Sequence, residues 1–152
     1  MRFGDTRRVS QQQVELIRRG YEAWNAGGRD FVLEHFSPDV EWATPRDDPD
    51  PAVYRGVQGV VDYWDQWRAA VGQLSFSPAE FVDAGGAVVV VAERRGRGES
   101  SGLEVADTVF QVFRFGPDGL CARVEEFYDR AEALAAADVA GSVKSDSRTR
   151  NS

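Results

Sequence analysis

The chain has 152 residues, 42% of them hydrophobic and 11% aromatic, a size typical of one domain with a continuous core. Its formal net charge of −7 argues against a nucleic-acid partner, because such binding depends on Lys and Arg neutralising phosphates. The single cysteine, Cys121, excludes an internal disulfide. No apolar run has the length of a signal peptide or a membrane span, which predicts a cytoplasmic protein without a membrane partner.

The N-terminal part of the chain predicts two helices. Apolar residues recur at helical spacing over Ser10–Ala26, with Ser10 as a plausible N-cap and Gly27-Gly28 as the stop. A short second helix is predicted over Asp30–Phe36, and Pro38 should end it.

A strand, a loop and a third helix follow. Val40–Thr44 is predicted as a strand, and the three prolines of Pro45–Pro51 exclude regular structure there. Helical periodicity returns over Val57–Val71. Alternating or valine-rich segments then predict four strands, which are Leu74–Phe81, Ala87–Arg97, Leu103–Phe115 and Leu120–Asp129, the last two joined by a turn at Gly116–Gly119.

Segregated helices and strands indicate an α+β domain with an antiparallel sheet. Ala131–Ala137 predicts one or two further helical turns. The segment Gly141–Ser152 is rich in Ser, Lys, Arg and Asp, which predicts a disordered tail. We therefore expect one domain over residues 10–140, with a flexible segment at 1–9 and the tail at 141–152.

Three segments resemble a known family in their order and spacing. They are YEAWNAGGRDFVLEHFSPDVEW, YRGVQGVVDYWDQW and FRFGPDGLCARVEEFYD, and they resemble the SnoaL-like branch of the nuclear transport factor two-like superfamily. The resemblance implies a cone, in which a strongly bent antiparallel sheet wraps three helices around a pocket. The family includes polyketide cyclases, limonene-epoxide hydrolase, ketosteroid isomerase and non-catalytic members, so a shared fold does not settle function.

The resemblance points to Glu126 and Arg94 as catalytic candidates. Cyclases and the epoxide hydrolase place an aspartate three positions before the acid that closes the last strand, and Glu126 has that position relative to Asp129. The hydrolases also carry an Arg-x-Asp pair, of which this chain keeps Arg94 but has Gly96 in place of the aspartate. The alternatives are a structural role for Glu126 in a polar network, or a last strand turned so that its other face, with Glu125 and Phe127, is the inner one.

Asp107 is the candidate for the missing carboxylate. Along Leu103–Phe115, one alternating set contains Asp107 and Gln111, and the other contains Glu104 and Arg114. Periodicity alone leaves both faces possible, and we favour the Asp107 set as the inner one because Glu104 and Arg114 require water. Asp107 and Glu126 would then flank Arg94, as a catalytic or a purely structural trio.

Aromatic residues should line the pocket, although most will belong to the core. No cofactor or metal is predicted. The acidic loop Pro45–Pro51 lacks the glycine and the glutamate of an EF-hand calcium loop. Gly96 and Gly98 lack the third glycine and the following helix of a dinucleotide-binding loop. His35 is a weak catalytic candidate, and Thr44 stands where ketosteroid isomerase has its base. The predicted ligand-binding residues are Tyr21, Trp24, Trp42, Tyr54, Trp64, Trp67, Gln111 and Tyr128.

The sequence thus predicts a domain that binds a small, largely apolar molecule, with cofactor-free hydrolase, isomerase or cyclase chemistry as one hypothesis. A non-catalytic ligand-binding or dimerisation module is the alternative. A homodimer is also predicted, because Phe110, Val112 and Phe127 would otherwise form an exposed apolar patch on the outer face of the sheet.

Overall fold

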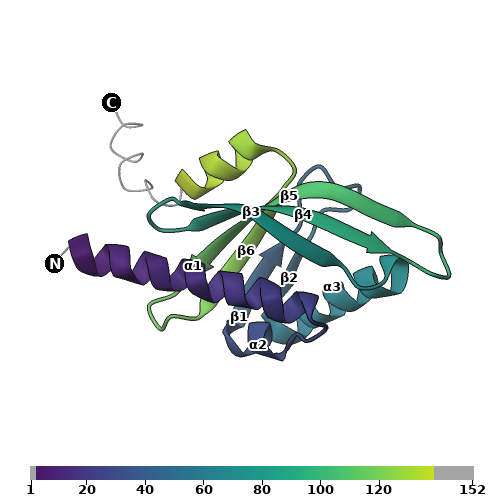
Figure 1. Ribbon diagram of the computed structural model, residues 1–152, viewed down its shortest axis with the longest axis horizontal. Coiled ribbons are helices and arrows are strands. Elements are labelled where there is room, and N and C mark those ends of the chain that lie inside the picture. The colour runs from purple at the N-terminus through teal and green to yellow at the C-terminus, as the bar shows by residue number, and fades with distance from the viewer. Residues whose placement is uncertain (1–2, 139–152) are drawn as a thin grey trace.

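The computed structural model describes residues 3–138, with side chains from residue 11 onward (Figure 1). The helices are α1 (Phe3–Asn25), α2 (Asp30–Glu34) and α3 (Gly56–Val71), and residues 130–138 form a further helix. The strands are β1 (Phe36–Ala43), β2 (Val53–Arg55), β3 (Ser75–Asp83), β4 (Val88–Arg97), β5 (Glu104–Phe115) and β6 (Cys121–Phe127). The predicted tail, residues 141–152, lies outside the described residues.

The six strands form one sheet in the order β2-β1-β6-β5-β4-β3. The prediction of a wholly antiparallel sheet is wrong at one pair, because β1 runs parallel to β6. With α1, α2 and α3 against one side of this open sheet, the chain has the predicted α+β, cone-like architecture (Figure 1).

The first helix and the first strand both begin earlier than their sequence patterns predict. Helix α1 starts at Phe3, so Ser10 lies within it and is not its N-cap. Helix α2 ends at Glu34, and Pro38 lies within β1. The proline is tolerated because the β1–β6 register shifts between Phe36 and Glu41, which leaves no ladder hydrogen bond for its missing N–H.

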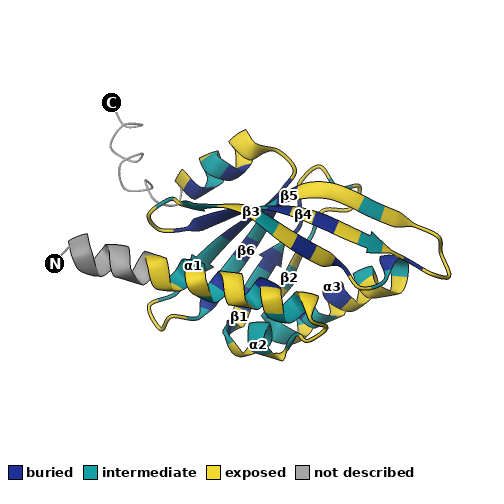
Figure 2. Cartoon of the chain, viewed as in Figure 1, coloured by how far each residue is buried: buried dark blue, intermediate teal, exposed yellow. Residues whose placement is uncertain are grey.

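The core fills the space between the inner face of the sheet and the helices. Val90 and Ala92 of β4 are completely buried there beside Ile17 of α1, and Val124 of β6 is buried against Val60 of α3 (Figure 2). Within residues 3–138, no helix is both long enough and apolar enough to cross a membrane. The predicted cytoplasmic location stays a prediction.

The outer face of the sheet is covered by the helix at residues 130–138 (Figure 1). Val112 and Phe127 are buried under it, packed against Ala133 and Ala137, and Phe110 joins the same cluster. The predicted exposed patch therefore does not exist, because the chain covers these side chains with its own C-terminal helix.

This packing predicts that the same substitution lowers the free energy of unfolding strongly at one position of the helix and hardly at all at a neighbouring position. Ala133→Asp places a carboxylate in the dry contact with the sheet, since Ala133 is completely buried, and should lower the free energy of unfolding by about 3 kcal/mol. Ala135 is exposed on the same helix, so Ala135→Asp should change it by less than about 0.5 kcal/mol. Urea unfolding of both variants checks this, and equal losses would contradict the packing.

Candidate functional site

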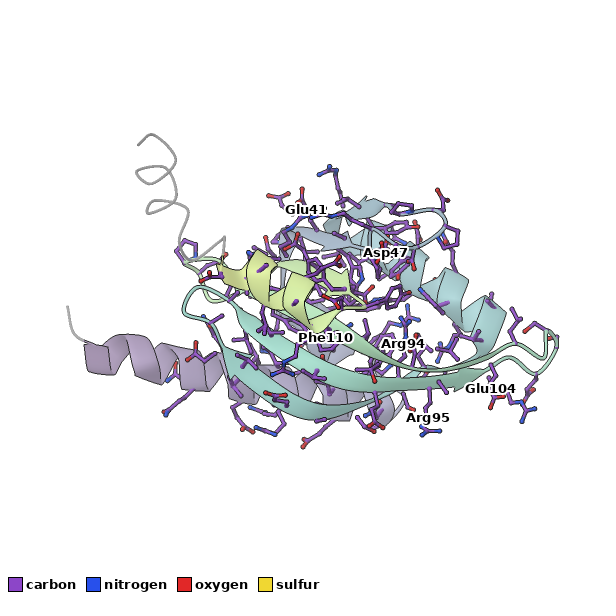
Figure 3. The ribbon with its side chains drawn as sticks, turned by 90° about the horizontal axis from the view of Figure 1, so that it is seen from above. Glu41, Asp47, Arg94, Arg95, Glu104 and Phe110 are labelled. Carbon is purple, nitrogen blue, oxygen red and sulfur yellow. The ribbon has the colours of Figure 1, made fainter. Side chains whose placement is uncertain are left out.

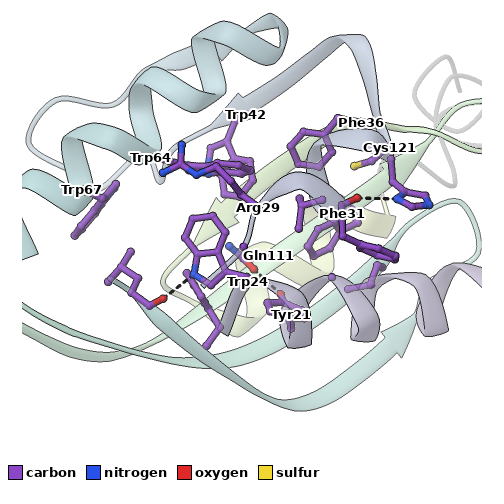
Figure 4. A pocket seen from close by; sticks show the side chains of 18 of the residues that line it. Tyr21, Trp24, Arg29, Phe31, Phe36, Trp42, Trp64, Trp67, Gln111 and Cys121 are labelled. Atoms are coloured by element: carbon purple, nitrogen blue, oxygen red, sulfur yellow. Dashed lines mark hydrogen bonds between the residues drawn. The ribbon is translucent and has the colours of Figure 1, made fainter. Parts of the chain in front are cut away.

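A cavity of about 110 Å³ lies between the inner face of the sheet and the three N-terminal helices (Figure 4). Its wall is mainly aromatic and aliphatic, and its polar groups are few. The predicted residues found in this wall are Tyr21, Trp24, Trp42, Trp64, Trp67, Gln111, Arg94 and Glu126.

The three remaining predicted residues do not line the cavity but contact residues that do. The ring of Tyr54 stacks on Tyr63 with centroids 4.5 Å apart. Tyr128 lies 5.9 Å from the Arg94 guanidinium and donates a 2.7 Å hydrogen bond to Asp48 in the acidic loop. Asp107 forms an ion pair with Arg94 at 2.8 Å and is half-exposed. All three therefore contact residues of the cavity wall without lining it.

Glu126 is a buried carboxyl group at the centre of a hydrogen-bond network. Its Oε1 accepts from Trp42 Nε1 at 3.0 Å and from the Tyr63 hydroxyl at 3.3 Å, and its Oε2 accepts from Gln111 Nε2 at 2.9 Å. Gln111 in turn accepts a hydrogen bond from the Tyr21 hydroxyl, which appears as a dashed line in Figure 4. Since Gln111 and Glu126 are direct partners across β5 and β6, the strand register creates this contact.

Two opposing effects set the pKa of Glu126. Burial raises it, because the cavity wall cannot solvate a carboxylate. Hydrogen bonds from Trp42 and Gln111 and the charge of Arg94 lower it, and burial outweighs them. Among the described residues, Oε1 has two donors and Oε2 has one, so Oε2 has the capacity to take up a proton.

Arg94 is held by a bidentate ion pair with Asp107. Its Nε and Nη2 donate to the two carboxylate oxygens at 3.0 and 2.8 Å, and the residues face each other directly in the β4–β5 register. The guanidinium is 3% exposed, against 40% for Asp107, and lies 4.9 Å from the centre of the Trp67 ring. Arg94 therefore brings a fixed positive charge into the apolar wall.

The structure explains why Gly96 replaces the carboxylate that the resemblance predicts on this strand. A Cβ atom at Gly96 would lie 2.7 Å from the Leu74 side chain and 3.1 Å from the Val71 carbonyl oxygen. An aspartate does not fit in that space. Asp107, on the neighbouring strand, supplies the carboxylate for Arg94 instead.

Comparison with known proteins places the chain in a family. Residues 17–124 match the model of the SnoaL-like domain. The chain belongs to the SnoaL-like family. No curated protein has a sequence similar enough to count as a match.

Solved structures share the fold of this SnoaL-like chain at low sequence identity. TerC, co-crystallized with polyporic acid, is 22% identical with a TM-score of 0.66, over 81% of this chain and 98% of that one. SalBIII, an epoxide hydrolase/cyclase-like enzyme in salinomycin pyran ring formation, is 18% identical with a TM-score of 0.65, over 80% and 93%. A Mycobacterium tuberculosis protein in complex with estradiol-17β-hemisuccinate is 14% identical with a TM-score of 0.63, over 78% and 94%.

Several cavity residues of this SnoaL-like domain were not predicted as ligand-binding residues, although His35 was a weak catalytic candidate. Phe31 and His35 line the cavity from α2 and the residue after it, where His35 Nδ1 lies 2.8 Å from the Phe31 carbonyl oxygen. Cys121 also lines it, and burial raises the pKa of this thiol to about 12. Among the residues that the structure describes, no three His, Cys, Asp or Glu side chains are grouped as metal ligands.

The raised pKa of Glu126 predicts a pH dependence of stability. Since the folded pKa lies above its ordinary value of 4.5, the folded chain binds this proton more tightly than the unfolded chain. The resulting stabilisation is complete below the unfolded pKa and is lost as pH rises through the folded pKa. The free energy of unfolding of the wild type minus that of Glu126→Gln should therefore fall as pH rises from about 4 towards neutrality.

Glu80 is the matched control in this experiment. A hydrogen bond from Arg130 lowers its pKa, so the same difference for Glu80→Gln should rise with pH. Urea unfolding at a series of pH values gives both quantities. A difference for Glu126→Gln that is flat or rises with pH would show that the donors, and not burial, control this carboxyl group.

Proposed function

We propose that this domain binds a small, largely apolar molecule in the cavity and that Glu126 exchanges a proton with it as a general acid or base. The observation that carries the proposal is a buried carboxyl group in the cavity wall whose Oε2 accepts one hydrogen bond, from Gln111, among the described residues. A carboxyl group with a raised pKa is suited to proton transfer near neutral pH. This is the position that the family resemblance selects.

Arg94 has a complementary role in this proposal. When Glu126 removes a proton from the ligand, negative charge develops on the ligand next to a guanidinium that Asp107 holds in place. A fixed charge in an apolar wall stabilises such an anion without reorganising solvent. The reaction class is therefore a cofactor-free isomerisation or cyclisation that proceeds through an oxyanion or enolate, or a hydrolysis in which Glu126 takes the proton from an attacking water and Arg94 stabilises the oxyanion formed on the ligand.

The ligands and activities of proteins with the same fold are compatible with this proposal. SalBIII is described as epoxide hydrolase/cyclase-like, TerC was co-crystallized with polyporic acid, and the mycobacterial protein is in complex with estradiol-17β-hemisuccinate. For the present chain these similarities support a small organic ligand in the aromatic cavity.

A non-catalytic binding module is the second candidate, and one observation favours it. Within the described part of the chain, every buried side-chain nitrogen or oxygen already has a hydrogen-bond partner. Trp42, Tyr63 and Gln111 hold Glu126 in a network that is complete without a ligand. In this alternative the carboxyl group only orders the cavity wall.

The proposal predicts that Glu126→Gln abolishes most of the activity. After an active substrate is found in a panel of epoxides, enones and polyketide-like aromatics, kcat/KM should fall at least about a hundredfold in this variant. Glu125→Gln is the control, because Glu125 lies next to Glu126 on the opposite face of β6 and pairs with Arg114 there. It should retain the wild-type rate.

Stability must be measured beside activity in both variants, since a folded but inactive Glu126→Gln protein is the decisive result. Full activity in a folded Glu126→Gln protein would remove the carboxyl group from the mechanism. Binding of the panel without turnover by the wild type would favour the binding module.

We also propose a homodimer, and its support is the family resemblance alone. The apolar side chains Phe110, Val112 and Phe127 no longer support it, because residues 130–138 cover them. A dimer must therefore use another surface. Light scattering should give twice the 16.8 kDa mass of one chain. The mass of a monomer at micromolar concentration would contradict it.

A further inference from the structure

The charged side chains of the cavity wall are mainly positive, whereas the net charge of the whole chain is negative. The chain has a net charge of −7, yet within the described residues the cavity wall includes three arginines and a single acidic residue, Glu126. Arg94 is neutralised by Asp107 at the inner end. The other two arginines, Arg29 and Arg68, belong to the opening, and they require a separate explanation.

Arg29 lies in the segment between α1 and α2. Its side chain lines the cavity and extends towards α3 (Figure 4). Its guanidinium lies 5.6 Å from the centre of the Trp64 ring, and its Nη2 donates to Asp65 at 3.0 Å. The Arg29 side chain is 23% exposed, whereas Asp65 is 59% exposed. A solvated carboxylate at the surface therefore holds a more buried cation over one of the cavity tryptophans, and such an ion pair is weak enough to exchange partners.

Arg68 lies three residues after Asp65 on α3, so the partner of Arg29 and the second arginine are neighbours on one face of this helix. Its Nη2 donates to the side-chain oxygen of Gln73 at 2.6 Å, which is a neutral acceptor. Among the ion pairs between described residues, none includes Arg68. The opening thus has two guanidinium groups and one competing carboxylate.

We infer that the ligand is an anion, with a planar apolar body between the cavity tryptophans and one carboxylate or similar oxyanion at the opening, bound by Arg29 and Arg68. This inference rests on the proposed ligand-binding function and adds the chemical class of the ligand. The ligand oxyanion takes the place of Asp65 on Arg29. Arginine is suited to this exchange because its planar fork binds carboxylates through two parallel hydrogen bonds.

The test compares two probes that differ only in charge, 1-naphthylacetate and 1-naphthylacetamide, by calorimetric titration of the full chain. The acetate should bind at least about fivefold more tightly than the amide, in spite of the negative net charge of the protein. Arg29→Gln and Arg68→Gln should each weaken acetate binding by about fivefold and leave amide binding unchanged. Rising ionic strength should weaken binding of the acetate alone.

Asp65→Asn should change acetate affinity in the opposite direction to the two arginine variants. Removal of the competing carboxylate should tighten acetate binding, and this gain should disappear in the Arg29→Gln background. Arg95→Gln is the control for net charge, because Arg95 is exposed beside the inward-facing Arg94 and lies outside the cavity wall (Figure 3). It should change neither affinity.

Each other outcome overturns the inference. Equal or tighter binding of the amide would show that the cavity prefers neutral ligands, and the proposed binding function would stand without the anion. An acetate preference that is insensitive to Arg29 and Arg68 would place the recognition of the anion elsewhere. If neither probe binds, the proposed binding function fails together with the inference.

Discussion

The buried carboxyl group of Glu126 connects most of the elements that surround the cavity. Its donors come from Trp42 on β1, Tyr63 on α3 and Gln111 on β5, and Tyr21 extends the network to α1. A buried carboxylate without partners would cost several kcal/mol, so these side chains must meet around it. This hydrogen-bond network therefore helps to fix how two helices pack on three strands.

Arg94 illustrates a second way of placing a charge in an apolar wall. Its partner Asp107 is half-exposed and solvated, while the guanidinium itself is buried against Trp67. Water therefore stabilises one end of the ion pair and the cavity receives the other end, which lowers the cost of burial. Because Val71 and Leu74 pack against Gly96, the carboxylate had to come from the neighbouring strand.

Alternation on the last three strands left two possible faces, and only the family resemblance and the charges of Glu104 and Arg114 favoured the faces with Gln111 and Glu126 as the inner ones. Their contacts could not be predicted, because the Gln111–Glu126 pair depends on a register shift between Arg114 and Phe115 that alternation does not reveal. The role of the C-terminal helix was also hidden, since alanines such as Ala133 give little hydrophobic periodicity. The prediction that Pro38 ends a helix was wrong for a related reason. The register shift in β1 makes a proline compatible with a strand at this position, and the sequence does not show that shift.

The orientation of the hydrogen bonds around Glu126 bears on its protonation state. Trp42 Nε1 and Gln111 Nε2 are donors that cannot accept, so they favour the ionised carboxylate, whereas burial favours the neutral acid. A proton on Oε2 therefore cannot be shared with Gln111 Nε2, which is itself a donor. The amide of Gln111 is fixed in its turn, because its oxygen accepts from Tyr21. Under the proposed function, the ligand in the cavity would be the partner with which Glu126 exchanges this proton.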